Sequence, residues 1–348
     1  MTSKAFSLIN YHNLNLLFEL FIFIKFNVKI HYSLFYYLNP PTSVIPSIQN
    51  KAAWKLKSVI TDIPKGKLGK KINYGYRIIK ETYSIIGPQA KDKSKRLAGN
   101  NLTCNNCHLN AGRKIGSGSF VGVMDRYPQF RGRENRTGTM KDRINGCMER
   151  SMNGRPFPLE SEEMDAILAY LEWLSEDVPQ DIAKLYKGYS DLEIPDFKAD
   201  TAKGKLVYLK NCSRCHQQDG TGMKNQGHPF SGYLYPPIAG NDTYNDGAGM
   251  NRVLTSARFI KGNMPFGATY DAPTLTDEEA YHVAAYINSL PRSTKSNRDN
   301  DFPELKLKPV STPYGPFADN FSEEQHKYGP FPPIISFYKE EYDLVKTK

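Results

Sequence analysis

Four of the five cysteines of this chain fall in two pentapeptides of the same design, Cys104-Asn-Asn-Cys107-His108 and Cys212-Ser-Arg-Cys215-His216. The two thiols of a CxxCH motif can add to the vinyl groups of a haem, and the histidine that follows can supply the proximal nitrogen to its iron. A zinc site would need further ligands close by, and a thioredoxin-like pair would need a βαβ pattern around it. Neither is visible, so the two motifs predict two covalently bound haem c groups.

The sixth ligand of each iron decides whether the haem carries electrons or takes part in chemistry. After the second motif the candidate is Met264, in Phe259-Ile-Lys-Gly-Asn-Met-Pro265, because a Met-Pro pair in this place is the usual ligand position of a cytochrome c. A thioether favours ferrous iron and raises the potential of the haem, as an electron exit requires. Met250, His228 and Lys261 are the substitutes if Met264 is only a core residue.

The stretch after the first motif has no Met-Pro pair but contains the fifth cysteine, Cys147, in Arg143-Ile-Asn-Gly-Cys-Met-Glu-Arg-Ser151. A leftover cysteine in an exported protein is usually a free buried thiol or part of an intermolecular disulfide. Cys147, however, lies 14 residues before the next helical segment, in the region where the second half of the chain has Met264. We predict that Cys147 ligates the first iron and lowers its potential, with Met148 or Met152 as the replacement.

Helices of matching design surround the two motifs. Ser161–Leu174 aligns without gaps on Asp277–Leu290, and both segments place apolar residues at three- and four-residue spacing. Upstream, Ile72–Ile86 and Thr201–Lys210 are predicted to be helices that lead into the two CxxCH motifs. A helix, a CxxCH motif, a ligand loop and a closing helix form the layout of a class I cytochrome c. The chain resembles two such domains in tandem, so the predicted fold class is all-α.

We place the first cytochrome c domain at residues 52–190 and the second at residues 198–295, with the polar stretch Gly188–Asp200 as the linker. After Pro291 the chain is rich in proline and tyrosine and has no sustained period. We therefore expect residues 296–348 to form an extended C-terminal tail whose aromatic side chains pack on the surface.

The N-terminal residues 1–50 are expected to lie outside the folded unit. They contain a hydrophobic stretch, Leu14–Phe26, but Glu19 and Lys25 interrupt it and no small-residue cleavage site follows. Covalent haem attachment takes place outside the cytoplasm, in most bacteria in the periplasm, so the chain should be exported. We interpret residues 1–50 as an export or anchor segment, or as the result of a wrongly assigned start codon.

The composition is that of a globular protein of about two domains. Of the 348 residues 39 % are hydrophobic, and 26 glycines with 23 prolines are too few for a low-complexity chain, so collagen-like, coiled-coil and disordered classes are excluded. The net charge of +10 suits nucleic acid, an anionic membrane surface, an acidic partner or a small anionic substrate. Because the basic residues are scattered along the chain, we do not expect binding of nucleic acid.

The order of the motifs resembles one family in particular. The chain is similar to the dihaem thiosulfate dehydrogenase (tetrathionate reductase) family of c-type cytochromes over roughly residues 55 to 335. The resemblance rests on the segments CNNCH, RGR, DRINGCMERSMNG, SEEMDAILAYLEWL, CSRCH, FIKGNMPFG, TLTDEEAYHVAAYINSLPR and YGPF. Its most distinctive element is the block around Cys147.

This resemblance implies an oxidoreductase that couples two thiosulfates into tetrathionate with release of two electrons, reversibly in some members. The implied catalytic residues are Cys147, Arg133, Arg143 and Ser151, and the implied proximal ligand of the active-site haem is His108. The second haem would transfer electrons to or from an external partner, such as a small cytochrome c or a quinone-linked cytochrome.

One position departs from part of the family. Some members have a lysine directly before the methionine of the second haem, where it ligates the oxidised iron, whereas this chain has Asn263. Steady ligation of the second iron by His216 and Met264 is therefore favoured.

Thiosulfate is a small dianion, and two of them at one iron need fixed positive charge in a water-poor pocket. If the segment around Cys147 is helical, Arg143, Cys147 and Ser151 share one face at four-residue spacing, and planar guanidinium groups match sulfonate oxygens. For Arg131 and Arg150 we favour pairing with haem propionates or a solvated face.

Two other functions stay open at this point. A plain dihaem electron carrier would explain both CxxCH motifs and Met264 but would leave Cys147 without a role. A haem subunit of the Sox sulfur-oxidation type also uses a cysteine-ligated haem, but it passes sulfur to a cysteine of a partner protein.

Overall fold

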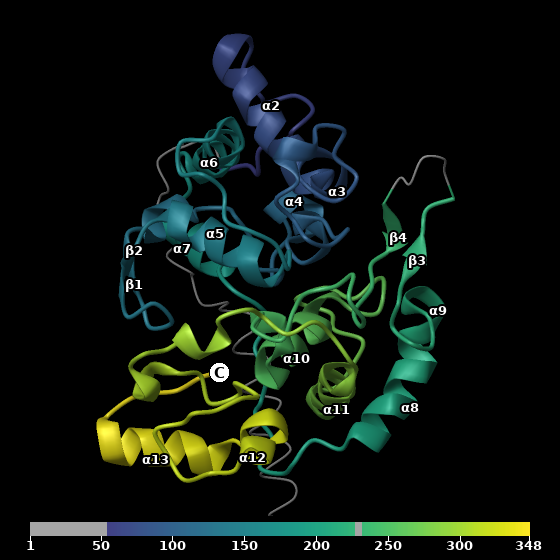
Figure 1. Cartoon of the computed structure of the whole chain (residues 1–348), viewed down its shortest axis with the longest axis vertical. Coiled ribbons are helices and arrows are strands. Elements are labelled where there is room, and N and C mark those ends of the chain that lie inside the picture. The colour runs from purple at the N-terminus through teal and green to yellow at the C-terminus, as the bar shows by residue number, and fades with distance from the viewer. Residues whose placement is uncertain (1–53, 227–231) are drawn as a thin grey trace, which may run out of the picture. The chain divides into compact units, whose positions relative to one another are not determined.

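The computed structural model describes residues 54–226 and 232–348, so the predicted export or anchor segment and the substitute ligand His228 lie outside the described residues. Lys55–Lys348 form one compact unit. Figure 1 shows that this unit is built mainly from helices, with two short antiparallel hairpins. Within the described ranges no helix combines the length and the apolar character that a membrane crossing requires. The expected all-α class with two tandem cytochrome c domains is confirmed.

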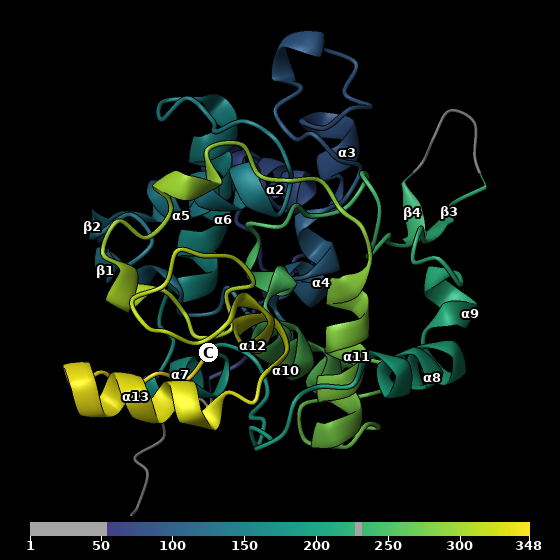
Figure 2. The ribbon, with the colours of Figure 1, turned by 60° about the horizontal axis from the view of Figure 1, so that its bottom comes forward.

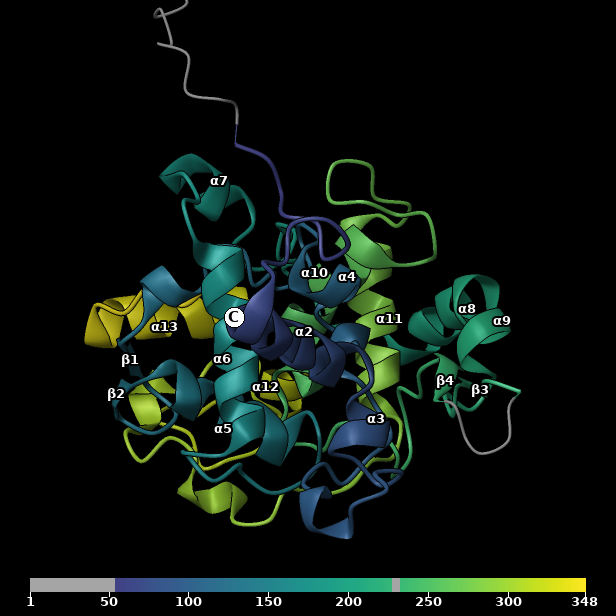
Figure 3. The same cartoon turned by 90° about the horizontal axis from the view of Figure 1, so that it is seen from above.

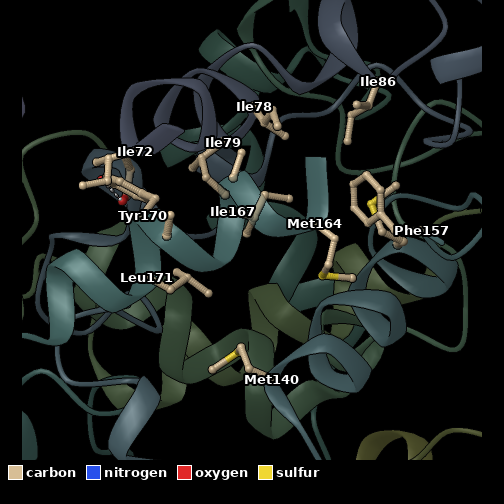
Figure 4. Packing of buried hydrophobic residues seen from close by; sticks show 14 of the residues in the cluster. Ile72, Ile78, Ile79, Ile86, Met140, Phe157, Met164, Ile167, Tyr170 and Leu171 are labelled. Carbon is tan, nitrogen blue, oxygen red and sulfur yellow. Dashed lines mark hydrogen bonds between the residues drawn. The ribbon is translucent and has the colours of Figure 1, made fainter. Parts of the chain in front are cut away.

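The first domain is organised by two helices that pack side by side, α2 (Gly66–Lys80) and α6 (Glu162–Ser175) (Figure 3). They approach closely at Gly75, where an added Cβ would lie 2.0 Å from the main-chain oxygen of Ala166. Apolar side chains fill the space around this contact (Figure 4). The buried residues labelled in that figure are Ile72, Ile78, Ile79, Ile86, Met140, Phe157, Met164, Ile167, Tyr170 and Leu171.

The helix that contains Cys147 is α5 (Met140–Arg150). A capping box fixes its start, because the Asp142 carboxylate accepts a hydrogen bond from the Thr139 main-chain nitrogen and the Thr139 hydroxyl accepts one from that of Asp142. The hairpin of β1 (Gln129–Arg131) and β2 (Arg136–Gly138) leads into this helix. The remaining short helices of the domain are α3 (Thr82–Ile85), α4 (Leu109–Gly112) and α7 (Gln180–Leu185).

The second domain repeats this design. The helix α8 (Thr201–Asn211) leads into the second motif through α9 (Ser213–His216) and packs beside α11 (Asp277–Ser289) (Figure 1). A Cβ added at Gly204 of α8 would lie 2.0 Å from the main-chain oxygen of His282 in α11, the counterpart of the contact at Gly75. The domain is completed by α10 (Val253–Asn263) and by the hairpin of β3 (Met223–Lys224) and β4 (Tyr233–Tyr235).

Three of the predicted helices are confirmed within one or two residues, and the fourth is divided. The segment predicted as one helix at Ile72–Ile86 is α2 followed by α3, and α2 begins six residues earlier, at Gly66. The break lies at Glu81, whose φ of −124° and ψ of 30° are not helical. A repeat of apolar residues at helical spacing continues through such a break, so the sequence does not reveal it.

The prediction of an extended tail is wrong for part of residues 296–348. This segment contains α12 (Glu323–Tyr328) and α13 (Pro332–Tyr342), both visible in Figure 2. The two prolines that indicated an extended chain occupy the first positions of α13, where the missing N–H groups have no helical partner to lose. The expected packing of aromatic residues is confirmed, since Phe331 and Tyr338 are buried in the second core cluster.

The stretch Gly188–Asp200 contacts the rest of the fold at several points, although about half of its residues are exposed. The Gly188 oxygen accepts a hydrogen bond from Gly118 of the first domain, and Ala199 donates one to Tyr328 in α12. Leu192 is buried within the second core cluster. The stretch therefore connects the domains as part of the fold. Its second residue, Tyr189, contacts the first domain through a β-bridge with Ser117.

Candidate active site

A cavity of about 590 Å³ lies beside the first CxxCH motif. Cys104, Cys107 and His108 line it together with Cys147 and Arg143, and most of its other walls are apolar. Among the apolar lining residues are Ile79, Ile86, Leu102, Met140, Ile144, Ile167 and Leu171. Two thiols, a histidine and a third sulfur around an apolar space are the chemistry that a covalently held haem with two axial ligands requires. The residues present fit this group.

His108, the predicted proximal ligand, is held in one orientation. Nδ1 of His108 donates a hydrogen bond of 2.6 Å to the Gly118 oxygen, and the ring lies 4.5 Å from that of Phe120 between centroids. Because the carbonyl only accepts, Nδ1 is protonated and Nε2 keeps its lone pair for iron. Gly118 has a φ of +63°, and an added Cβ would lie 3.4 Å from the His108 ring, which explains the glycine.

The second motif shows the same arrangement. Nδ1 of His216 donates a hydrogen bond of 2.8 Å to the Pro236 oxygen, so Nε2 is again available. Met264 follows the last residue of α10 and packs against the second core cluster, which includes Cys212. Lys261, considered above as a substitute ligand, forms an ion pair instead, with its ammonium 2.5 Å from the Asp277 carboxylate. Met250, another substitute, lines the cavity of the first motif.

Cys147 has an unusually acidic thiol. Its Sγ accepts a hydrogen bond of 3.0 Å from Nη1 of Arg143, one helical turn earlier in α5. Burial by itself raises the pKa of Cys147, but the charge of Arg143 and the neighbouring His108 outweigh burial and bring the pKa down to about 6. The sulfur is therefore mainly a thiolate at neutral pH, the form that ligates iron and attacks sulfur. The expected common face of Arg143, Cys147 and Ser151 is confirmed, since all three line the cavity.

Arg133 has a different environment. It is not among the described residues that line the cavity, and its guanidinium forms an ion pair with Asp301 and stacks 4.7 Å from the ring of Phe302. Its catalytic role stays a prediction. Arg131 binds Glu134 at 2.8 Å, and Arg150 lies 3.9 Å from the same carboxylate.

The solvated face considered for Arg150 is wrong, because the residue is only 6 % exposed. Arg131 is not a free solvated charge either, because its guanidinium donates two hydrogen bonds to the Glu134 carboxylate. Both arginines lie near the Glu134 carboxylate, an arrangement that periodicity in the sequence does not indicate.

The sequence does not indicate several of the residues that line the cavity. Tyr189 comes from the linker and Lys187 directly precedes it, whereas Tyr244 comes from the second domain and Lys348 from the C-terminal segment. Burial raises the pKa of Tyr189 to about 12, so its hydroxyl stays protonated beside Cys147. No local pattern marks these residues, because each reaches the cavity through contacts between segments that are far apart in sequence.

Comparison with known proteins decides the family. Residues 90–180 match the family model described as SoxA/TsdA, cytochrome c domain, and residues 201–291 match the model for cytochrome c. A thiosulfate dehydrogenase of Psychrobacter arcticus is 36 % identical over 241 residues, which cover 69 % of each chain. One of Stutzerimonas stutzeri is 36 % identical over 66 % of this chain and 70 % of its own. This chain belongs to the thiosulfate dehydrogenase family.

A solved structure agrees with this assignment. The thiosulfate dehydrogenase TsdBA from Marichromatium purpuratum, in its as-isolated form, superposes with a TM-score of 0.63 at 33 % identity. The match covers 70 % of this chain and half of the length of that one. As a member of the thiosulfate dehydrogenase family with two cytochrome c domains, the protein is an oxidoreductase with two covalently bound haem c groups. The resemblance inferred from the motifs is confirmed.

Proposed function

We propose that this protein oxidises thiosulfate, joining two molecules into tetrathionate with release of two electrons. The observation that carries the proposal is the Cys147 thiolate, held 3.0 Å from the Arg143 guanidinium in the cavity of the first CxxCH motif. A plain electron carrier needs no acidic thiol in this place. The named relatives, all thiosulfate dehydrogenases, support the same activity.

Cys147 and Arg143 have different roles in this reaction. The Cys147 sulfur forms a bond with the outer sulfur of the first thiosulfate, and two electrons leave as this S–S bond forms. The outer sulfur of the second thiosulfate then attacks that outer sulfur, which yields tetrathionate and returns Cys147 as a thiolate. Arg143 stabilises the thiolate and offers hydrogen bonds to sulfonate oxygens. His108 with Cys147, and His216 with Met264, would hold the two haem irons, which would supply one-electron acceptors.

The apolar walls exclude water from this chemistry. Each guanidinium–anion contact is stronger in such a cavity than in bulk solvent, because little water screens it. The second haem would pass electrons to an external acceptor such as a small cytochrome c or a quinone-linked cytochrome. We place the protein in the periplasm, since covalent haem attachment takes place outside the cytoplasm.

The test is the visible spectrum of the purified, oxidised, haem-loaded protein during addition of thiosulfate, with tetrathionate assayed in the same sample. We expect reduction of a haem and formation of tetrathionate in the wild type and neither in Cys147→Ala. Lys141→Ala is the matched control, because Lys141 lies on the same helix and pairs with Glu160 away from the cavity.

The outcomes separate the alternatives. Turnover retained in Cys147→Ala would contradict the proposed role of this sulfur. A wild type that neither reduces its haem with thiosulfate nor reoxidises it with tetrathionate would be a dihaem electron carrier. Activity that appears only after addition of a second, cysteine-bearing protein would favour the Sox-type function.

A further inference from the structure

The helix α8 has one buried face and one face with exposed leucines. Its buried residues, Gly204 and Tyr208, pack on α11, where the ring of Tyr208 lies 5.2 Å from that of Tyr286 between centroids. Leu206 and Leu209 lie on the opposite side of the helix and are 69 % and 42 % exposed. Figures 1, 2 and 3 all show α8 at the edge of the molecule. Neighbouring exposed apolar side chains of this kind mark a surface that contacts another molecule.

Basic side chains flank the two leucines. Residues 201–218 contain four cations and no carboxylate. Lys205 lies on one side of the leucines, whereas Lys210 and, one turn later in α9, Arg214 lie on the other, and all three are exposed. Among the described residues, the fourth cation, Lys203, is the only one of the four that pairs with a carboxylate within 4.0 Å. The three flanking charges are therefore available to an anionic partner.

The same face leads directly into the second CxxCH motif. Cys212 follows the last residue of α8, and Cys215 lies in α9. The Ser213 hydroxyl donates a hydrogen bond of 2.8 Å to the Leu209 oxygen, so α9 begins against the last turn of α8. A haem attached through the two cysteines would thus be held at the end of the leucine-bearing face.

We propose that Lys205, Leu206, Leu209, Lys210 and Arg214, the leucine–lysine face, form the docking surface for an acidic electron-transfer protein. The leucines supply an apolar centre, and the cations steer an anionic partner. One electron would pass from the reduced second haem to the oxidised metal centre of the partner. A second copy of this chain does not fit, because its net charge is +10 and like charges would meet. That thiosulfate supplies the electron rests on the proposed function, whereas the docking surface does not.

Electron transfer from the full-length, haem-loaded protein tests this face without thiosulfate. The protein is reduced with dithionite, freed of excess reductant and mixed in a stopped-flow instrument with an oxidised monohaem cytochrome c, either an acidic or a basic one, at increasing NaCl. The variants are Lys205→Glu with Lys210→Glu, and Leu206→Gln. Lys67→Glu with Lys70→Glu is the matched control, because it makes the same charge change at exposed positions of α2, the counterpart of α8 in the first domain.

At low ionic strength the wild type should reduce the acidic acceptor faster than the basic one. Lys205→Glu with Lys210→Glu should slow the reaction with the acidic acceptor about tenfold or more and remove its decline with salt, since salt screens the same attraction. Leu206→Gln should slow it at high salt too, because salt does not screen an apolar contact. Calorimetric binding of the two oxidised proteins, in which no electron moves, should weaken in both variants and not in the control.

The docking surface is overturned if both variants match the control with the acidic acceptor in rate and in binding. It is also overturned if Lys205→Glu with Lys210→Glu loses only binding to phosphatidylglycerol vesicles, because the face would then belong to a membrane surface. If the wild type does not oxidise thiosulfate, the proposed function fails, and the rates measured after dithionite reduction still decide the docking surface.

Discussion

Asn263 donates a hydrogen bond of 2.8 Å from its side-chain nitrogen to the main-chain oxygen of Gly116. Asn263 directly precedes Met264, the predicted ligand of the second iron, and Gly116 lies two residues before Gly118, whose oxygen orients His108. The Asn263 side chain is 3 % exposed and is held by a second bond to its own helix, at the Phe259 oxygen. A buried amide at the end of α10 thus joins the position of the predicted ligand Met264 to the loop that orients His108.

Replacing Asn263 with Ala should loosen this junction. The variant loses one buried hydrogen bond between the domains and leaves the Gly116 oxygen without its amide partner, which costs about 1–3 kcal/mol. We expect a lower midpoint in the denaturant unfolding of the haem-loaded protein, with both haems still attached. Thr269→Ala, on an exposed loop of the second domain, is the control. Equal midpoints for the two variants would show that the contact contributes nothing.

Met264→Gly should alter the second haem alone. Loss of the thioether removes the ligand that favours ferrous iron, so the potential of this haem should fall and electron exit should slow. Spectra and redox titrations of the variant report this directly, while thiosulfate should still change the spectrum of the first haem. Lys261→Ala is the matched variant, because this lysine is bound to Asp277. A second-haem potential that is unchanged in Met264→Gly but shifted in Lys261→Ala would assign the ligand to the lysine.

Asp142→Asn should destabilise the start of α5, and the effect should depend on pH. The hydrogen bond from Arg136 (2.6 Å), followed by those from Thr139, lowers the pKa of Asp142 below its ordinary value. Because the pKa is lower in the folded state, the contribution is present above the unfolded pKa of about 4 and disappears as the pH falls through the folded pKa. Loss of this cap costs about 1 kcal/mol at pH 7.

Urea unfolding of wild type and Asp142→Asn measures this effect. The difference in free energy of unfolding should stay constant from pH 7 to about pH 5 and shrink toward pH 3, because the carboxylate of the unfolded chain takes up a proton while that of the folded protein stays ionised. A difference that stays constant over this range would show that the charge of Asp142 does not stabilise the helix.

Gly75→Ala and Gly204→Ala should be strongly destabilising, each in its own domain. In both cases the new methyl carbon would lie 2.0 Å from a main-chain oxygen of the partner helix, so the helices must separate. Overpacking of this kind costs about 1–3 kcal/mol or more. Gly249→Ala, where an added Cβ meets nothing within 4 Å, is the control for thermal unfolding. Unchanged melting of the first two variants would contradict the close helix contacts.

The sequence by itself determined the features that repeat locally. The CxxCH motifs, the amphipathic segments around them and the common face of Arg143, Cys147 and Ser151 follow from spacing along the chain, because a helix converts fixed spacing into position. The capping box of Thr276 and Glu279 at the start of α11 likewise depends only on residues three positions apart.

Only the tertiary structure decided what surrounds these features. The pairing of Arg133 with Asp301, the cation supplied by Lys348 and the hydroxyl of Tyr189 depend on segments that meet across the fold. The helix α13 was also hidden, since its leading prolines are compatible with either an extended chain or a helix start, and burial of residues such as Tyr338 favours the helix. Spacing along the chain fixes local geometry, whereas the packing of distant segments fixes which charges and hydroxyl groups surround Cys147.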